Sequence, residues 1–154
     1  MYIVRGKNNL KDSFLQFWFK GFEIAIEDMN ETDRNIIFKQ CGKACSDSYT
    51  KQIYIDEYER SENINDFLIR LKNRFPEIEY QIIKENEIVL LTYRYCACDL
   101  VKNKYITTPL MCECSRQSLL YNWGTVIGES KVNIKLLKSI LNGDDCCQFE
   151  ICLN

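Results

Sequence analysis

The spacing of apolar residues changes near Pro76, and this change limits the folds that the chain can adopt. Before Pro76, apolar residues recur every three or four positions, as on one face of an amphipathic helix. After it, Ile78, Tyr80 and Ile82 alternate with polar residues, which is typical of a half-buried strand. The sequence therefore predicts a helical part over residues 1–76 and a sheet-plus-helix part over 77–154.

The first helix is expected over residues 14–29, where Ser13 and Gln16 form a capping box. Its apolar face is interpreted as a core-packing stripe; a sharper hypothesis is that its aromatic side chains also line a pocket or a dimer interface. That face consists of Phe14, Trp18, Phe22, Ala25 and Met29, widened by Leu15, Phe19 and Ile26. Two further helices are expected over 31–46, with Asn30 as N-cap, and over 62–74.

Two hairpins flank one more helix in the second part. The first hairpin turns at residues 85–87 and returns as a strand over 88–95. The helix is expected over 115–127, with Gly128 as its C-cap, and the second hairpin turns at 142–145. The order α-α-α-β-β-α-β-β predicts a single α+β domain, with N-terminal helices packed on an antiparallel sheet of two hairpins.

The chain has nine Cys and no His, which narrows the chemistry that it can perform. Without His, Ser–His and Cys–His catalysis and imidazole-ligated haem are excluded. The net charge of -2 argues against nucleic acid as a partner, and no Gly-rich loop for a nucleotide phosphate occurs. No apolar run is long enough for a secretory signal or a membrane span, so we expect a cytoplasmic protein with reduced thiols.

Seven of the nine Cys are candidate metal ligands because thiolates bind soft ions such as Zn(II), usually four to an ion. Six of them form three close pairs, which are Cys41 with Cys45, Cys96 with Cys98, and Cys112 with Cys114. The seventh, Cys147, shares the buried face of the last strand with Phe149 and Ile151. A close pair delivers two ligands from one segment, so the sequence predicts a thiolate zinc site. Buried, unreactive Cys and thiol redox chemistry are the alternatives.

The last third of the chain carries a motif of a known family. The chain ends on the pattern Gly143-Asp144-x-x-Cys147-x-Phe149-x-Ile151, preceded by Cys112-Glu113-Cys114 at a helix start. This pattern resembles the 4-vinyl reductase or hydrocarbon-binding domain superfamily. It is most similar to small bacterial members grouped with L-2-amino-thiazoline-4-carboxylate hydrolase-like proteins. The resemblance covers residues 78–153 well and the first helices loosely, and Cys147 is the matched Cys.

This resemblance implies helices packed on an antiparallel sheet, in a fold related to haem–nitric oxide sensor domains and to a vesicle-tethering subunit. It further implies a small apolar or aromatic ligand bound between helices and sheet, a zinc ion held by Cys near position 147, and a homodimer. Because the chain has no His, haem is not expected.

The leading hypothesis is a small-molecule-binding domain, of a sensory kind, with a thiolate zinc site and no nucleotide. Its ligand pocket is expected at Trp18, Phe22, Tyr95, Tyr121 and Trp123. One alternative is a hydrolase of a small ring C–N substrate that uses Cys114 at a helix N-terminus or a zinc-bound water. Another is a thiol redox protein, and the sequence leaves open whether the chain is an enzyme.

Overall fold

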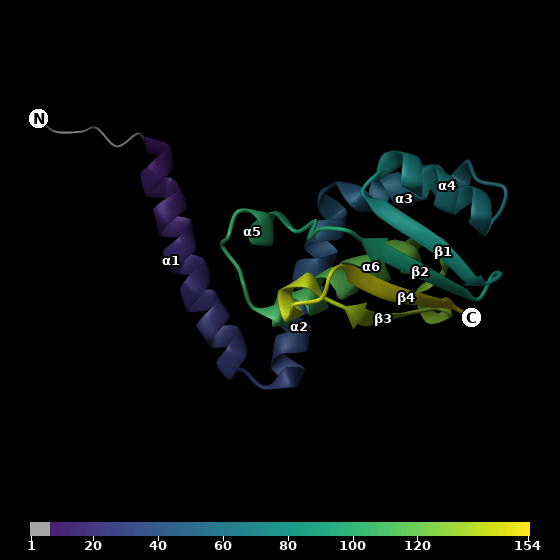
Figure 1. Ribbon diagram of the computed structural model, residues 1–154. Coiled ribbons are helices and arrows are strands. Elements are labelled where there is room, and N and C mark those ends of the chain that lie inside the picture. Colours follow the sequence, from purple (N-terminus) through teal and green to yellow (C-terminus); the bar gives the residue numbers. More distant parts are fainter. Residues whose placement is uncertain (1–6) are drawn as a thin grey trace, which may run out of the picture.

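The computed structural model describes residues 7–154, with side chains from residue 13 onward, and it has the predicted α+β architecture (Figure 1). The helices are α1 (Lys7–Asp28), α2 (Glu31–Cys45), α3 (Lys51–Glu59), α4 (Ile64–Arg74), α5 (Asp99–Lys102) and α6 (Cys112–Ile127). The strands are β1 (Ile78–Lys84), β2 (Ile88–Tyr93), β3 (Val132–Lys138) and β4 (Cys147–Leu153). No described helix is both long enough and apolar enough to cross a bilayer.

The four strands form one antiparallel sheet in the order β1-β2-β4-β3. The register places Tyr80 opposite Leu91, and Leu91 opposite Phe149, so that one face of the sheet is a continuous apolar layer. Helices α3, α4 and α6 cover that face and contribute Tyr54, Phe67 and Trp123 to the main core. The alternation read from the sequence is confirmed in β4, where Cys147, Phe149, Ile151 and Leu153 are the buried residues.

Helices α2 and α3 form one helical run that is interrupted by a π-helical turn over Ser46–Thr50. Asn122 of α6 faces this turn: its side-chain oxygen accepts a hydrogen bond from the Ser46 hydroxyl. Its amide nitrogen donates to the Thr50 hydroxyl at 3.1 Å. A π-helical turn contains one residue more than an α-helical turn. The buried hydrogen bonds to Asn122 stabilise this irregular turn.

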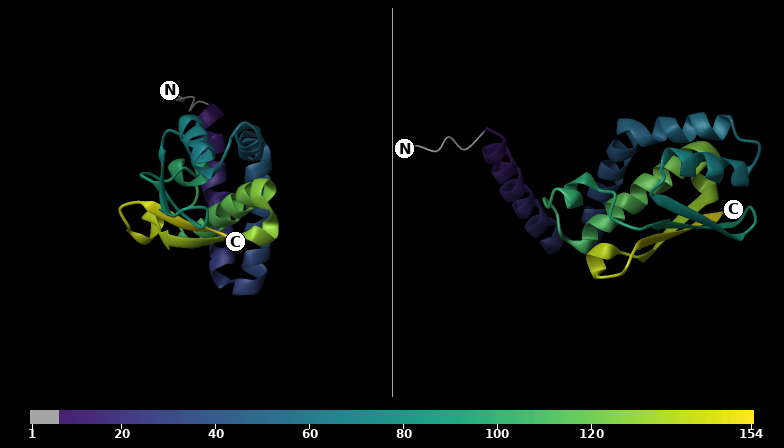
Figure 2. Two further views of the ribbon diagram at one scale, coloured as in Figure 1. Left: turned by 90° about the vertical axis from the view of Figure 1, so that its right-hand side faces the viewer. Right: turned by 45° about the horizontal axis from the view of Figure 1, so that its top comes forward.

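Helix α1 leaves the rest of the molecule at an angle and touches it near its own C-terminal end (Figures 1 and 2). A small second core there contains Ile26, Phe38 and Ile106. The buried carboxylate of Glu23 accepts hydrogen bonds from the backbone N–H groups of Thr107 and Thr108, the latter at 2.7 Å. Glu23 therefore fastens α1 to the loop that precedes α6.

Several predicted boundaries are corrected by the structure. Helix α1 begins before Ser13, so the capping box expected at Ser13 and Gln16 is wrong. The core-packing interpretation of its aromatic stripe is wrong for Phe14 and Trp18, which are 64% and 54% exposed. The strand expected over 88–95 ends at Tyr93, because the chain turns away into a loop there.

The remaining differences concern helices. The helix expected over 115–127 begins at Cys112, so the pair Cys112 and Cys114 lies in its first turn. The helix expected over 62–74 begins at Ile64, behind an Asn63 cap. Helices α3 and α5 were absent from the expected order. The N-cap Asn30 and the C-cap Gly128 are confirmed.

Candidate functional site

Helices α2 and α6 are in close contact at Gly42. A Cβ atom at this position would lie 2.8 Å from the carbonyl oxygen of Cys114 and 2.8 Å from the backbone nitrogen of Ser118. Real Cβ atoms do not approach other heavy atoms so closely, so the contact requires glycine. Because Cys41 and Cys45 flank the α2 side of this contact, the helix crossing brings both beside Cys114.

The first group of thiols, called here the α2-side group, consists of Cys41, Cys45, Cys98 and Cys114. Burial raises the pKa of the Cys114 thiol to about 12. Electrostatic repulsion from Cys41, Cys45 and Cys98 adds to this rise. The Ser118 hydroxyl is hydrogen-bonded to the Cys45 sulfur. Cys41 and Cys45 are exposed while Cys114 is buried, so the group runs from the surface into the protein.

The second group, called here the β4-side group, consists of Cys96, Cys112 and Cys147. Tyr93 at the end of β2 pairs with Cys147 at the start of β4, so the chain that leaves β2 carries Cys96 past Cys147. The sulfur of Cys112 lies 2.9 Å from the hydroxyl oxygen of Ser139. Three separate segments therefore deliver these thiols to one end of the sheet.

Burial raises the pKa of each thiol in the β4-side group, and one other thiol of the group raises it further. The pKa of Cys147 is raised further by Cys112, although the backbone N–H of Ile140, 3.4 Å from the sulfur, opposes the rise. The pKa of Cys96 is raised further by Cys147, and that of Cys112 by Cys96. The three thiols thus influence one another's protonation, and all three are poorly hydrated.

Cys98 belongs to the surroundings of both groups. It contributes to the raised pKa of Cys114 on one side and to the raised pKa values of Cys96 and Cys112 on the other. It is the N-cap residue of α5, and the segment just before it has no regular secondary structure. The position of its sulfur is therefore set by a loop and not by a helix or a strand.

The two remaining Cys lie outside these groups. Cys146 interacts with the charged side chains of Asp145 and Lys138, and Cys152 lies 3.5 Å from a carboxylate oxygen of Glu150. Cys152 projects from the face of β4 opposite the main core. Its thiol provides a natural comparison for the clustered ones.

All nine Cys are free thiols. Among residues 7–154, no three His, Cys, Asp or Glu side chains lie close enough together to hold one metal ion as they stand. The donor chemistry nevertheless suits a soft ion, because both groups consist of sulfur alone. Coordination at about 2.3 Å would therefore require these side chains to move closer together.

The aromatic residues expected to form a ligand pocket lie in different places. Trp123 is fully buried in the main core, where its ring packs edge-to-face against Phe67 at 5.4 Å. Trp18 and Phe22 stack on each other along α1, with ring centroids 6.1 Å apart. Tyr95 is exposed on the loop after β2.

Tyr121 is a half-buried residue of α6 with cations over its ring. The ammonium groups of Lys43 and Lys51 lie 4.9 and 5.2 Å from the ring centroid. Lys51 also donates a hydrogen bond of 3.1 Å to the Tyr121 hydroxyl. The structure therefore brings Trp18 and Phe22 together and places Tyr121 and Trp123 elsewhere.

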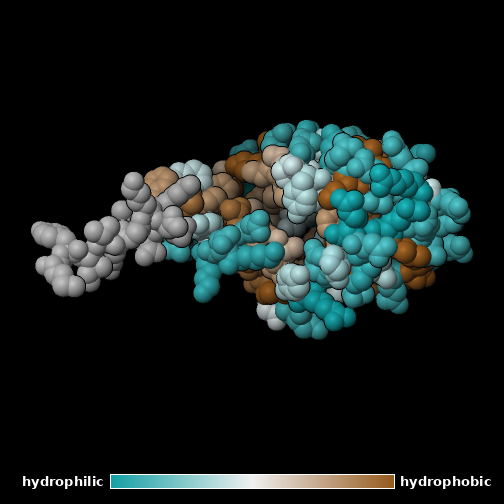
Figure 3. All heavy atoms as spheres, turned by 90° about the horizontal axis from the view of Figure 1, so that it is seen from above, coloured by the Kyte–Doolittle hydropathy of each residue, from teal (hydrophilic) through white to brown (hydrophobic). Residues whose placement is uncertain are grey.

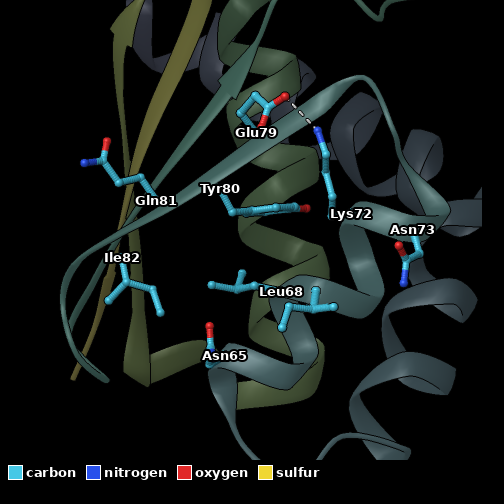
Figure 4. A pocket seen from close by; sticks show the side chains of 9 residues that line it. Asn65, Leu68, Lys72, Asn73, Glu79, Tyr80, Gln81 and Ile82 are labelled. Atoms are coloured by element: carbon cyan, nitrogen blue, oxygen red, sulfur yellow. Dashed lines mark hydrogen bonds and ion pairs between the residues drawn. The ribbon is translucent and has the colours of Figure 1, made fainter.

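An open pocket of about 470 Å³ lies between α4 and the edge strand β1 (Figure 4). Figure 4 shows Tyr80, Leu68 and Ile82 around its apolar part, with the ion pair of Lys72 and Glu79 at one end, 2.8 Å between the charged atoms. The pocket is lined by Asn65, Leu68, Ile69, Lys72, Asn73, Glu79, Tyr80, Gln81 and Ile82.

The sequence interpretation missed this pocket, although one signal was present. The alternation of β1 breaks at Ile82 and Ile83, which places two isoleucines side by side near the end of an edge strand. Edge strands usually carry charged side chains that prevent pairing with other chains. An exposed apolar pair on such a strand therefore indicates a surface that binds another molecule.

Comparisons with known proteins give a similarity of fold. No family model matches the chain, and no curated protein matches it either. A solved structure that is similar is the trafficking protein particle complex subunit 3 from Naegleria fowleri, covalently bound to palmitic acid. It has a TM-score of 0.50 and 10% sequence identity, with 95% of this chain and 96% of that chain covered. At this identity the likeness concerns the fold: the chain is similar to that subunit in its arrangement of helices and strands.

Proposed function

We propose that the chain is a cytoplasmic small-molecule-binding domain in which Cys thiolates hold a soft metal ion, Zn(II). The observation that carries the proposal is that thiols from four separate segments, α2, the loop after β2, the first turn of α6 and the start of β4, raise one another's pKa values. Thiols that served only as small apolar residues would have no reason to be neighbours across α2, the loop after β2, α6 and β4.

The metal would act as a structural tie. In a chain without His, thiolates are the strongest Zn(II) ligands present, and a shell closed by four thiolates is typical of structural zinc. Such a shell would fasten α2 and the loop after β2 to α6. Because the ligands are protonated thiols without the ion, binding would release protons and would be coupled to the stability of the fold.

The ligand would bind between helix and sheet. The pocket between α4 and β1 has a volume within the range of small-molecule sites, and it combines apolar Leu68 and Ile82 with a few polar groups. The similar trafficking subunit carries covalently bound palmitic acid, which supports an apolar ligand for this arrangement of elements. We therefore propose an apolar or aromatic small molecule as the occupant.

A homodimer forms part of this proposal. Helix α1 exposes a second apolar face, opposite the one that meets the body, with Phe14, Phe17, Trp18 and Ile24. Figure 3 shows apolar side chains gathered along α1 and where α1 meets the rest of the molecule. A second copy would cover a face of this kind, which is costly to leave in water.

The experiment that tests the metal is elemental analysis of reduced protein purified without added metal. The proposal expects at least one zinc per chain, and removal of the zinc by a chelator should lower the unfolding temperature. The variant Cys152→Ser is the matched control, because its thiol lies outside both groups and its loss should leave the zinc content unchanged. A zinc content near zero in fully reduced protein would overturn the metal part of the proposal.

A thiol redox protein is the second candidate, and the exposure of Cys41 and Cys45 favours it. Peroxide treatment followed by thiol alkylation and mass spectrometry separates the two candidates. Reversible formation of one disulfide within the α2-side group in metal-free protein supports the redox function. Thiols that resist peroxide while zinc is bound support the metal site.

A further inference from the structure

Strand β1 is an edge of the sheet, and part of it lines the pocket shared with α4 (Figure 4). At the start of β1, the carbonyl oxygen of Ile78 accepts a hydrogen bond of 2.6 Å from the ammonium group of Lys72 in α4. The N–H of Ile78 donates to the carbonyl oxygen of Phe75 at 3.0 Å. Both backbone groups of Ile78 are therefore bonded to residues at the end of α4 and point away from β2.

The hydrogen bonds between β2 and β4 lead to the same orientation. The N–H of Leu153 in β4 donates to the carbonyl oxygen of Glu87 at 2.7 Å, so the backbone of Glu87 faces β4. The backbone groups of successive residues in a strand face its two neighbours alternately. By this alternation, the residues of β2 that are opposite Tyr80 and Ile82 also face β4. The backbone groups of Tyr80 and Ile82 therefore point outward from the edge of the sheet.

The open part of this edge is short and is bounded at both ends. Lys72 covers its beginning, and a register shift between Ile82 and Lys84 interrupts the regular pairing at its end. Bulges and charged side chains of this kind protect edge strands from other chains. Between these two points, Tyr80 and Ile82 present two N–H and two carbonyl groups. In the described part of the chain, no helix or loop is hydrogen-bonded to these four groups.

We propose that the ligand of this pocket is a short, uncharged apolar peptide, which binds in extended form as an added strand beside β1; this rests on the binding function proposed for the pocket. Equivalent groups of Tyr80 and Ile82 lie about 6.5–7 Å apart, which is the repeat of an extended chain. An added strand offers N–H and carbonyl groups at the same repeat. Every second side chain of that strand points to the same face of the sheet as Tyr80 and Ile82, and so into the pocket.

The lining of the pocket indicates which side chains the peptide carries. Leu68 and Ile69 of α4 and Ile82 of β1 form its apolar part, and Ile69 and Ile82 are exposed. The two charged residues of the lining, Lys72 and Glu79, form an ion pair of 2.8 Å and so contribute no net charge. The pocket therefore suits a peptide with apolar residues at alternate positions and neutral residues between them.

The test uses the full chain and the capped peptide acetyl-Thr-Val-Thr-Val-Thr-amide, with amide exchange measured residue by residue by NMR. In the free protein, the outward N–H groups of Tyr80 and Ile82 should exchange with deuterium quickly, whereas Gln81, which faces β2, should exchange slowly. The peptide at ten times its dissociation constant should slow the exchange of Tyr80 and Ile82 about tenfold. The exchange of Gln81 is the internal control and should change little. An equal effect on all three amides, or no effect, would overturn the added strand.

Two N-methylated versions of the peptide test whether its backbone is recognised. One version is methylated at its second and fourth residues, and the other at its first, third and fifth residues. Because the N–H groups of an added strand face β1 alternately, one version should bind at least about tenfold more weakly than the other. Equal affinity of the two versions would overturn recognition through the edge of β1.

The neutral probe N-phenyl-1-naphthylamine separates this inference from the proposed function. The peptide should displace the probe, since both occupy the pocket. Binding of the probe without any binding of the peptide would overturn the added strand and leave the small-molecule pocket standing, whereas binding of neither would overturn both. If the amides of Tyr80 and Ile82 are protected in the free protein at high but not at low concentration, a second copy covers the edge, and the peptide is overturned as its occupant.

Discussion

Gly42 of α2 and Cys114 of α6 are in backbone contact: a Cβ atom added at residue 42 would stand 2.8 Å from the carbonyl oxygen of Cys114. The atoms that it would meet include helix backbone, which cannot swing aside as the end of a flexible side chain can. This contact therefore sets the distance between the two helices, and through it the distance between the thiols on either side.

Gly42→Ala is expected to destabilise the protein by roughly 1–3 kcal/mol, because the added methyl group pushes two packed helices apart. It should also lower metal content, since Cys41 and Cys45 would move away from Cys114. Urea unfolding followed by circular dichroism measures the first effect, and elemental analysis measures the second. The matched control is Gly21→Ala on α1, where nothing lies within 4 Å of the added atom. An unchanged free energy of unfolding for Gly42→Ala would contradict the helix contact.

Ile82→Asp is expected to weaken binding of an apolar ligand in the pocket between α4 and β1. Ile82 lines the pocket while Ile83, its neighbour, does not, so Ile83→Asp is a control of the same chemistry one residue away. Fluorescence titration with the neutral probe N-phenyl-1-naphthylamine should show about tenfold weaker binding for Ile82→Asp, a loss of about 1.4 kcal/mol. Equal binding by both variants would place the ligand elsewhere.

Ser46 and Asn122, which form the polar contact at the π-helical turn, should contribute to the free energy of unfolding in a coupled way. Asn122→Ala leaves the buried Ser46 hydroxyl without its partner, and we expect a loss of about 1–3 kcal/mol in the free energy of unfolding. The double variant Ser46→Ala with Asn122→Ala should cost less than the sum of the two single changes, because the orphaned hydroxyl is gone. Additive losses in a double-mutant cycle would show that the two side chains act independently.

The attachment of α1 should weaken in acid. Burial raises the pKa of Glu23, but hydrogen bonds from Thr107 and Thr108 outweigh burial and hold the pKa below its usual value of 4.5. A carboxyl with a lowered folded pKa contributes stability above its unfolded pKa, and this stability is lost as the pH falls through the folded value. The free energy of unfolding should therefore fall more steeply below about pH 4.5 in the wild type than in Glu23→Gln. If the free energy of unfolding depended on pH in the same way in both proteins, Glu23 would not be the group that attaches α1.

The outward face of α1 should control the oligomeric state. Phe17 is 78% exposed, so Phe17→Glu is expected to leave the fold of one chain intact while it places a charge in the proposed dimer interface. Analytical ultracentrifugation should find a dimer for the wild type and a monomer for this variant. Ile83→Glu, at an exposed position on the sheet, should remain a dimer. A wild-type chain that is monomeric at high concentration would contradict the homodimer.

The fold could be predicted from the sequence wherever local signals and burial agree. Asn30 caps α2 because its side chain accepts the N–H of Asp33, an arrangement that the sequence spacing already indicated. Likewise, the alternation in β4 predicted correctly that Cys147 faces the core. In both cases, residues that are close together in the sequence determine the local structure.

The sequence did not reveal features that depend on contacts between distant residues. Helix α3 was missed because its β-branched residues favour strands, whereas the packing of Tyr54 against Trp123 keeps the segment helical. The residues that line the pocket between α4 and β1 were not predicted, because the expected pocket was based on aromatic side chains, most of which lie on α1 and α6. Which thiols are neighbours was not visible either, because it depends on the Gly42 contact and on where β2 ends.

Strands β2 and β4 occupy the middle of the sheet and are hydrogen-bonded on both sides, while β1 and β3 form its edges. Backbone amides in such a pair exchange with deuterium last, since opening them requires the whole domain to unfold. Cys147 starts one of these strands, and the loop with Cys96 and Cys98 leaves the other directly after Tyr93. The segments that carry Cys96, Cys98 and Cys147 therefore begin at the slowest-exchanging backbone of the molecule, so local fraying of α1 or α4 leaves these thiols in place.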